Sequence, residues 1–139
     1  MNEKEKKRIK VYLQGYGREE EKLRQIEAEI DYINQTIDST SQIFDGMPRG
    51  SGISDKTARE AQRLCDLSID LIEQRFEAAT KRKEIGETIR SVEDTKYMRL
   101  LYLRYIELRS WGKVSEEMGI SPRWIFDMHN KALEEIAEK

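Results

Sequence analysis

Cysteine, histidine and proline are scarce in this chain of 139 residues, which holds one cysteine, one histidine and two prolines. A lone cysteine, Cys65, permits no internal disulfide, and a lone histidine, His129, argues against metal sites and histidine-based catalysis. Carboxylates are plentiful, but they lie beside lysine and arginine at the spacings of solvated helix faces. We therefore expect neither an enzyme nor a cofactor, and we expect a reducing cytoplasm as the compartment.

Long apolar runs are also missing. None approaches the roughly 20 residues that a membrane-spanning helix needs. The charged start, Met1 to Arg8, leads into no apolar signal region, so we expect neither secretion nor a membrane partner. The mean hydropathy is -0.80, yet apolar residues recur with regular spacing. This combination predicts a soluble, helix-rich protein rather than a disordered one.

An excess of positive charge is absent as well, since the formal net charge is -2. This value argues against a polycation that coats nucleic acid without preference. From Thr95 onward the chain has eight basic residues and seven acidic ones. Any DNA binding must then come from a local patch, reinforced by dimerisation or a second protein. The basic run from Lys4 to Lys10 either contacts DNA phosphates or is a solvated, frayed end.

Apolar residues at helical spacing are what the chain has in abundance. From Ile9 to Ile37 they recur every three or four positions, which predicts one long helix over residues 5–38. Residues 39–55 are rich in glycine and serine and predict a loop. A second long helix, capped by Ser54 or Asp55, follows to about Val92. The fold class is therefore predicted to be all-α, with residues 1–94 as an antiparallel helical hairpin that makes a homo-oligomer.

A short cassette in the last third of the chain predicts two helices joined by a tight glycine turn. Val114 and Met118 share one helical face, and Gly119 can adopt the positive φ of a helix end. Ser121 is placed as the N-cap of a helix that begins at Pro122. Residues 95–139 therefore read as a helix-turn-helix domain that binds DNA, with a third helix to about residue 138.

The third helix has one apolar side, which we expect to be buried. Its other side carries Arg123, Asp127, Asn130 and Lys131, with Trp124 and Phe126 at the edges. Arginine can pair with guanine, asparagine with adenine, aspartate with cytosine, and lysine with a phosphate. These polar residues can equally form a solvated face, and the two aromatic residues can pack on a neighbouring helix. The candidate DNA-binding residues are Ser121, Arg123, Trp124, Phe126, Asp127, Asn130 and Lys131.

The segment from Tyr102 to Glu107, followed by Trp111, the cassette and Lys131-Ala132-Leu133, resembles region 4 of bacterial sigma-70 factors. More widely, the chain resembles small phage and prophage proteins related to late transcription regulators of the ArpU and RinA type. The step Met47-Pro48 and the residue Asp55 add to that likeness. The resemblance implies a helix-turn-helix that reads double-stranded DNA in a bacterial host cell, with RNA polymerase as a possible second partner.

The same resemblance assigns base contacts to Arg123, Phe126 and Asp127. Sigma factors have basic or amide side chains at the last two positions. We therefore expect this chain to recognise a DNA site other than a standard -35 element, or to bind a protein surface. Two hypotheses stay open: a sequence-specific transcription regulator, and an interaction protein that binds RNA polymerase or a phage protein without base readout.

The glycine-rich residues 46–52 lack the ending of a phosphate-binding loop, which argues against nucleotide binding.

Overall fold

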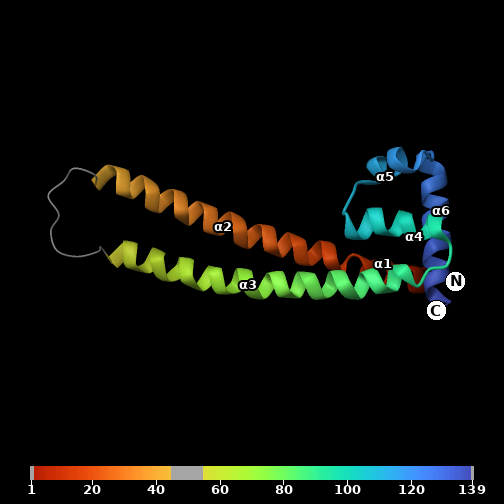
Figure 1. Ribbon diagram of the computed structural model, residues 1–139, viewed down its shortest axis with the longest axis horizontal. Helices are drawn as coiled ribbons and strands as arrows, with labels where there is room; N and C mark the ends of the chain where they lie inside the picture. Colours follow the sequence, from red (N-terminus) through yellow and green to blue (C-terminus); the bar gives the residue numbers. More distant parts are fainter. Residues whose placement is uncertain (1, 45–54, 139) are drawn as a thin grey trace. The chain divides into compact units, whose positions relative to one another are not determined.

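The computed structural model of the protein describes residues 2–44 and 55–138, and these residues form helices without any strand (Figure 1). The prediction of an all-α fold is confirmed at this level. The expected glycine-rich loop falls mainly on residues 45–54, which lie outside the described residues, as do Met47-Pro48 and Ser54. The elements in chain order are α1 (Glu3–Leu13), α2 (Gly15–Phe44), α3 (Asp55–Arg90), α4 (Thr95–Leu101), the π-helical segment η1 (Tyr102–Ile106), α5 (Trp111–Met118) and α6 (Pro122–Ala137).

The long helix expected over residues 5–38 is in fact two helices, α1 and α2, with Gln14 between them. Glycine weakens a helix because it gains the most backbone freedom in the unfolded chain, and Gly15 stands directly at the break. Gly15 is buried, and a Cβ atom added there would lie only 3.4 Å from Ile85 Cδ1. Gly15 therefore packs directly against the Ile85 side chain of α3.

The expected loop boundaries also need correction. Helix α2 continues to Phe44, six residues beyond the predicted end at residue 38. Asp55, expected as a cap or loop residue, is the first residue of α3. Residues 39–44 are mostly polar, and polar residues such as Gln, Ser and Thr are tolerated in a helix at a cost of only a few tenths of a kcal/mol each, up to about 0.7 kcal/mol.

The chain divides into two compact units, which are named here the terminal unit (residues 1–20 with 78–139) and the middle unit (residues 21–77). This division differs from the boundary expected between residues 94 and 95. The terminal unit combines the C-terminal helices with α1 and with the last part of α3. Residues from both ends of the chain therefore build one core.

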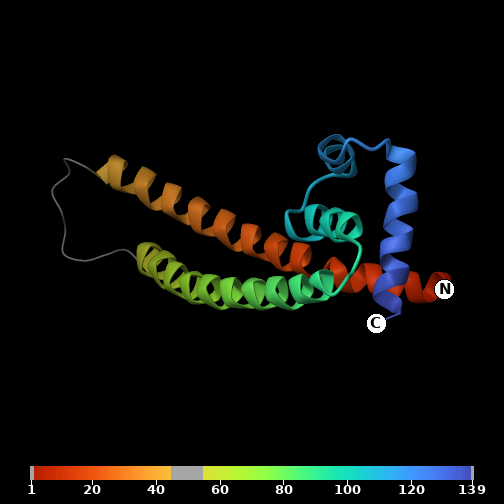
Figure 2. The same cartoon turned by 45° about the vertical axis from the view of Figure 1, so that its right-hand side comes forward.

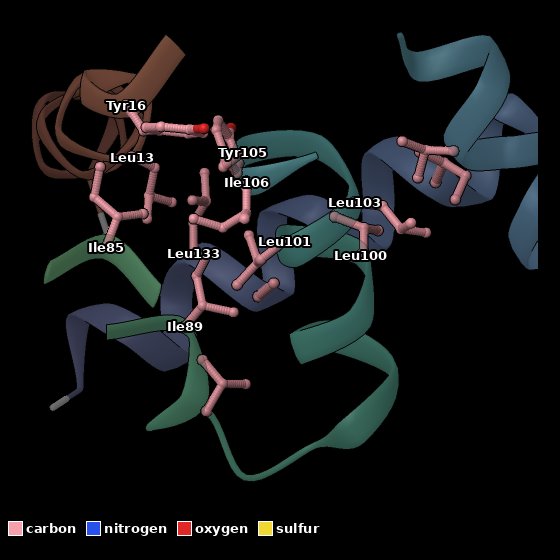
Figure 3. Packing of buried hydrophobic residues seen from close by; sticks show 14 of the residues in the cluster. Leu13, Tyr16, Ile85, Ile89, Leu100, Leu101, Leu103, Tyr105, Ile106 and Leu133 are labelled. Atoms are coloured by element: carbon pink, nitrogen blue, oxygen red, sulfur yellow. The ribbon is translucent and has the colours of Figure 1, made fainter. Parts of the chain in front are cut away.

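The core of the terminal unit is apolar and draws on every helix of that unit. Figure 3 shows Leu13, Ile85, Ile89 and Leu133 pointing toward one another from α1, α3 and α6. Helix α6 packs against α1, α4 and α5. Because each truncation of such a residue costs about 2–5 kcal/mol, this cluster holds α6 in place. The largest side chains with almost no exposed surface are Leu13, Ile85, Ile89, Val92, Leu100, Leu101, Val114, Ile125 and Leu133.

The middle unit consists of parts of α2 and α3, which Figures 1 and 2 show side by side. Among its described side chains, Ile33 of α2 and Leu67 of α3 are buried. An ion pair joins Glu29 Oε1 to Arg63 Nη2 at 3.4 Å across the two helices. Within the described ranges, no helix combines the length and apolar character that membrane crossing requires.

Candidate nucleic-acid interface

The connection between α5 and α6 is a tight turn centred on Gly119. This residue has φ 64° and ψ 33°, the left-handed conformation, and ends α5 as the sequence predicts. The N–H of Ile120 donates to the carbonyl of Ser115 at 3.1 Å, and the hydroxyl of Ser115 bonds the Ile120 carbonyl. The turn thereby satisfies backbone groups at the end of α5 and fixes the direction of the next helix.

Helix α6 begins at Pro122, as predicted, with Ser121 at the N-cap position. Ser121 has the extended conformation of a cap, φ -61° and ψ 151°, but its side chain makes no capping hydrogen bond. Its hydroxyl therefore does not hold the helix start. Proline at the first helical position lacks an N–H, so one fewer backbone donor needs a partner there.

The two sides of α6 have opposite character. Ile125, Ala132 and Leu133 are buried, and the predicted apolar side is confirmed as the packed side. Arg123, Asp127 and Lys131 are exposed on the rest of the helix, together with Trp124, 64% of whose surface is accessible. A helix with this division offers a row of solvent-facing side chains on a firmly held frame.

Phe126 has a different environment from Trp124. Its ring centroid lies 5.3 Å from that of Trp111 in α5, and half of its surface remains accessible. The guanidinium of Arg104 lies 4.6 Å from the centroid of Trp111, a cation–π contact, and Arg104 Nη1 donates to the Arg109 carbonyl at 2.9 Å. Arg104 of the π-helical segment thus supports Trp111, and Trp111 supports Phe126.

His129 is buried on the packed side of α6, as expected for a structural histidine. Its Nε2 lies 2.7 Å from the hydroxyl of Tyr105, and its ring meets Trp111 edge-on at 4.7 Å between centroids. Burial, with Lys10, Arg104 and Lys6 nearby, lowers the pKa of His129 to about 4. Burial also raises the pKa of Tyr105 to about 12. Both rings are therefore neutral at pH 7.

Asp127 and Lys131 form an ion pair one helical turn apart, with 3.7 Å between Oδ2 and Nζ. Both side chains are more than half exposed, so the pair contributes little to stability, about 0–1 kcal/mol. The surface of α6 is also hollowed. The residues lining this hollow are Arg123, Trp124, Phe126, Asp127 and Asn130, which are five of the seven candidate residues; Ser121 and Lys131 lie outside it.

A family model for proteins of unknown function, DUF1492, matches residues 54–137. The chain belongs to the DUF1492 family. No curated protein and no solved structure matches it significantly. The DUF1492 match starts at α3 and runs through α6, so it includes all seven candidate residues and spans the expected boundary at residue 94.

A second hollow of the terminal unit lies partly outside the DUF1492 match. Glu3, Lys6, Lys7 and Lys10 of α1 line it together with residues of α6, namely Phe126, His129, Asn130 and Leu133. Sequence reasoning noted this basic run but had no means to place it beside α6, because the two helices are more than 100 residues apart. The alternative of a solvated, frayed end is correct only in part. Lys4, Lys7 and Lys10 are exposed, but the segment is not frayed, since α1 is helical from Glu3 and Asn2 Oδ1 accepts from the Glu5 N–H at 2.8 Å.

Metal ligands do not gather in this DUF1492 protein over the part of the chain that the structure describes: it contains no group of three or more histidine, cysteine, aspartate or glutamate residues arranged to hold an ion. Cys65 is an exposed free thiol on α3. The side chains that line the α6 hollow offer hydrogen bonding, stacking and ion pairing.

Proposed function

We propose that this DUF1492 protein is a sequence-specific DNA-binding transcription regulator of phage or prophage origin. In this proposal α5, the Gly119 turn and α6 act as a helix-turn-helix similar to sigma region 4, and α6 enters the major groove of double-stranded DNA. The observation that carries the proposal is the division of α6, with Arg123, Asp127 and Asn130 lining an open surface while Ile125 and Leu133 anchor the opposite side.

The proposed roles follow from side-chain chemistry. The fork of Arg123 matches the two acceptors of guanine, and the amide of Asn130 matches adenine. Asp127 accepts from the amino group of cytosine. Lys131 binds a phosphate, which requires its amine to exchange Asp127 for the DNA backbone. Because the Asp127–Lys131 pair is exposed and weak, that exchange has a low cost.

The proposal includes self-association through an antiparallel hairpin of α2 and α3. Ile69 and Ile72 of α3 support it, since 57% and 68% of their surfaces are accessible and they lie three residues apart on one helix face. Exposed isoleucines at such spacing are typical of a seam that a second helix covers. A dimer would present two α6 helices to two half-sites and would compensate for the nearly neutral charge of residues 95–139.

The deciding experiment selects fragments from phage and bacterial genomic DNA with the purified protein, then measures affinity for the enriched sequence as salt rises. We expect binding that weakens steeply between roughly 50 and 200 mM salt. Arg123→Ala should relax the sequence preference by about 1–3 kcal/mol, whereas Lys131→Ala should weaken binding to all sequences alike. Lys96→Ala, on the exposed part of α4, is the matched control and should leave binding unchanged. A selection that enriches no sequence would contradict the proposal.

A second candidate function is supported by the exposed aromatic residues. Trp124 is 64% accessible and Phe126 is half accessible, and such pairs of aromatic side chains are enriched where proteins bind proteins. In this alternative the α6 surface binds RNA polymerase or another phage protein without reading bases. Trp124→Ala should then abolish capture of RNA polymerase while leaving the circular dichroism spectrum intact. Unchanged capture would remove the support for this alternative.

A further inference from the structure

Helix α1 is a firmly anchored basic element. It contains five basic residues and two glutamates within Glu3–Leu13. Leu13 at its end is fully buried, and the hydroxyl of Tyr12 donates to Glu84 Oε1 at 3.1 Å on α3. The lysines of α1 are thus presented from a fixed helix rather than from a loose chain end, and fixed cations lose less entropy when they bind.

These lysines lie where α1 crosses α6. Figures 1 and 2 show α6 crossing α1, and the α1 residues Lys6, Lys7 and Lys10 share a hollow with Phe126 and Asn130. The same Phe126 and Asn130 also line the hollow that contains Arg123 and Asp127. The two hollows therefore adjoin one another along α6 and share two of its side chains.

The positive charge of α1 reaches α6 electrostatically. Lys10 and Lys6 are among the charges that lower the pKa of His129, a residue of α6. Lys7 and Lys10 are exposed, whereas Lys6 is mostly covered and pairs with Glu3 at 3.5 Å. Lys7 and Lys10 are consequently the amines at this crossing that are most accessible to an anion.

We propose that Lys7 and Lys10 bind backbone phosphates of the DNA duplex whose bases α6 contacts, so that helices from both ends of the chain form one composite interface. Packed helices have axes roughly 8–10 Å apart, and the major groove is about 12 Å wide. A lysine on a helix packed against α6 thus lies near the backbone phosphates at the edge of the major groove when α6 occupies that groove. This inference rests on the proposed function, and it supplies the positive charge that residues 95–139 lack.

The test compares two double variants of the full chain, each of which removes two positive charges from α1. Lys7→Gln with Lys10→Gln changes lysines that line the hollow beside α6, whereas Lys4→Gln with Arg8→Gln changes exposed residues that do not line the hollow. Fluorescence anisotropy with a labelled mixed-sequence DNA duplex of two helical turns gives Kd at several salt concentrations. Thermal unfolding checks that both variants keep the wild-type fold.

We expect the Lys7/Lys10 variant to reduce the slope of log Kd against log salt by about 1.8, because each phosphate contact contributes about 0.9. The Lys4/Arg8 variant should keep the wild-type slope. Equal slopes for the Lys7/Lys10 variant and the wild type, or equal losses in both variants, would overturn the composite interface while leaving DNA binding by α6 in place. If the wild type itself shows no salt-sensitive binding to this duplex or to selected DNA, the proposed function fails and this inference fails with it.

Discussion

At the scale of single residues, the buried pair of Tyr105 and His129 connects the packing of α6 to pH. His129 contacts Tyr105 and Trp111, which belong to η1 and α5, so its ring joins three consecutive elements. A charged imidazolium in this position would lack the water that solvates it in the unfolded chain. The protein therefore favours the neutral ring, and the pKa of His129 falls from 6.5 to about 4.

The lowered pKa of His129 predicts acid sensitivity. Below pH 6.5 the unfolded chain binds a proton at this residue while the folded chain does not, so the free energy of unfolding falls as pH drops from about 6.5 to about 4. The loss can reach about 3 kcal/mol for this one group. Urea unfolding of the wild type and of His129→Gln at pH 7 and pH 4.5 measures it.

Glutamine keeps a hydrogen-bonding group near Tyr105 but does not titrate. We expect the carboxylates to contribute equally to both proteins, so that the difference between them isolates the histidine. The variant should lose clearly less stability on acidification than the wild type. The same loss in both proteins would show that His129 does not carry the pH dependence.

At the scale of elements, the turn between α5 and α6 depends on one backbone conformation. A Cβ atom added at Gly119 would meet no atom within 4 Å, so space does not require glycine there. The backbone conformation of Gly119 is what requires glycine. Its φ is 64°, and L-residues with a side chain are strained in this left-handed region. The direction in which α6 leaves the turn is therefore set by φ at this position.

Substitution of Gly119 tests this reasoning. Gly119→Ala should lower the free energy of unfolding by about 1–2 kcal/mol, and Gly119→Asn should cost less because asparagine visits the left-handed region more readily. Gly112→Ala is the control, since Gly112 lies within α5 and a Cβ atom added there would meet only Ser110 Oγ, at 4.0 Å, an ordinary contact. It should raise stability by about 0.5–1 kcal/mol. Changes of the same sign at both glycines would contradict the argument.

Some of the helix ends could be predicted from the sequence, and others could not. The end of α5 and the start of α6 were predictable because Gly119 and Pro122 are local signals that act through their own backbone. The end of α2 at Phe44 was not, because no local stop signal precedes it. The π-helical turn at Tyr102–Ile106 was also missed, since apolar spacing does not distinguish it from an ordinary helix turn.

The candidate site, too, was predictable from the sequence only in part. The exposed and buried sides of α6 followed from a period of 3.6 residues, so Arg123, Asp127 and Ile125 could be sorted correctly. The residues of other helices that surround the exposed side of α6 could not be predicted from the sequence. Lys7 and Lys10 approach α6 through packing between distant segments, and no local pattern encodes such a contact.

At the scale of the whole molecule, the middle unit leaves apolar side chains accessible, and this predicts self-association. Replacing Ile69 and Ile72 with glutamate should convert a dimer into a monomer, because the charges would be buried without partners in the seam. Lys56→Glu, at an exposed polar position of α3, is the control and should leave the dimer intact. Sedimentation equilibrium over a range of concentrations distinguishes the two states. A wild-type chain that is monomeric throughout would refute self-association.

The core shared by α1, α3 and α6 also has a consequence for how the protein is made. Helix α1 precedes the other described helices in the chain, so it emerges from the ribosome before Leu133 and the rest of α6. Packing that joins such distant segments must close a long loop, which slows folding compared with local contacts. Until translation reaches α6, the apolar side of α1 lacks that partner, and the surface proposed to bind DNA forms only after α6 has been synthesised.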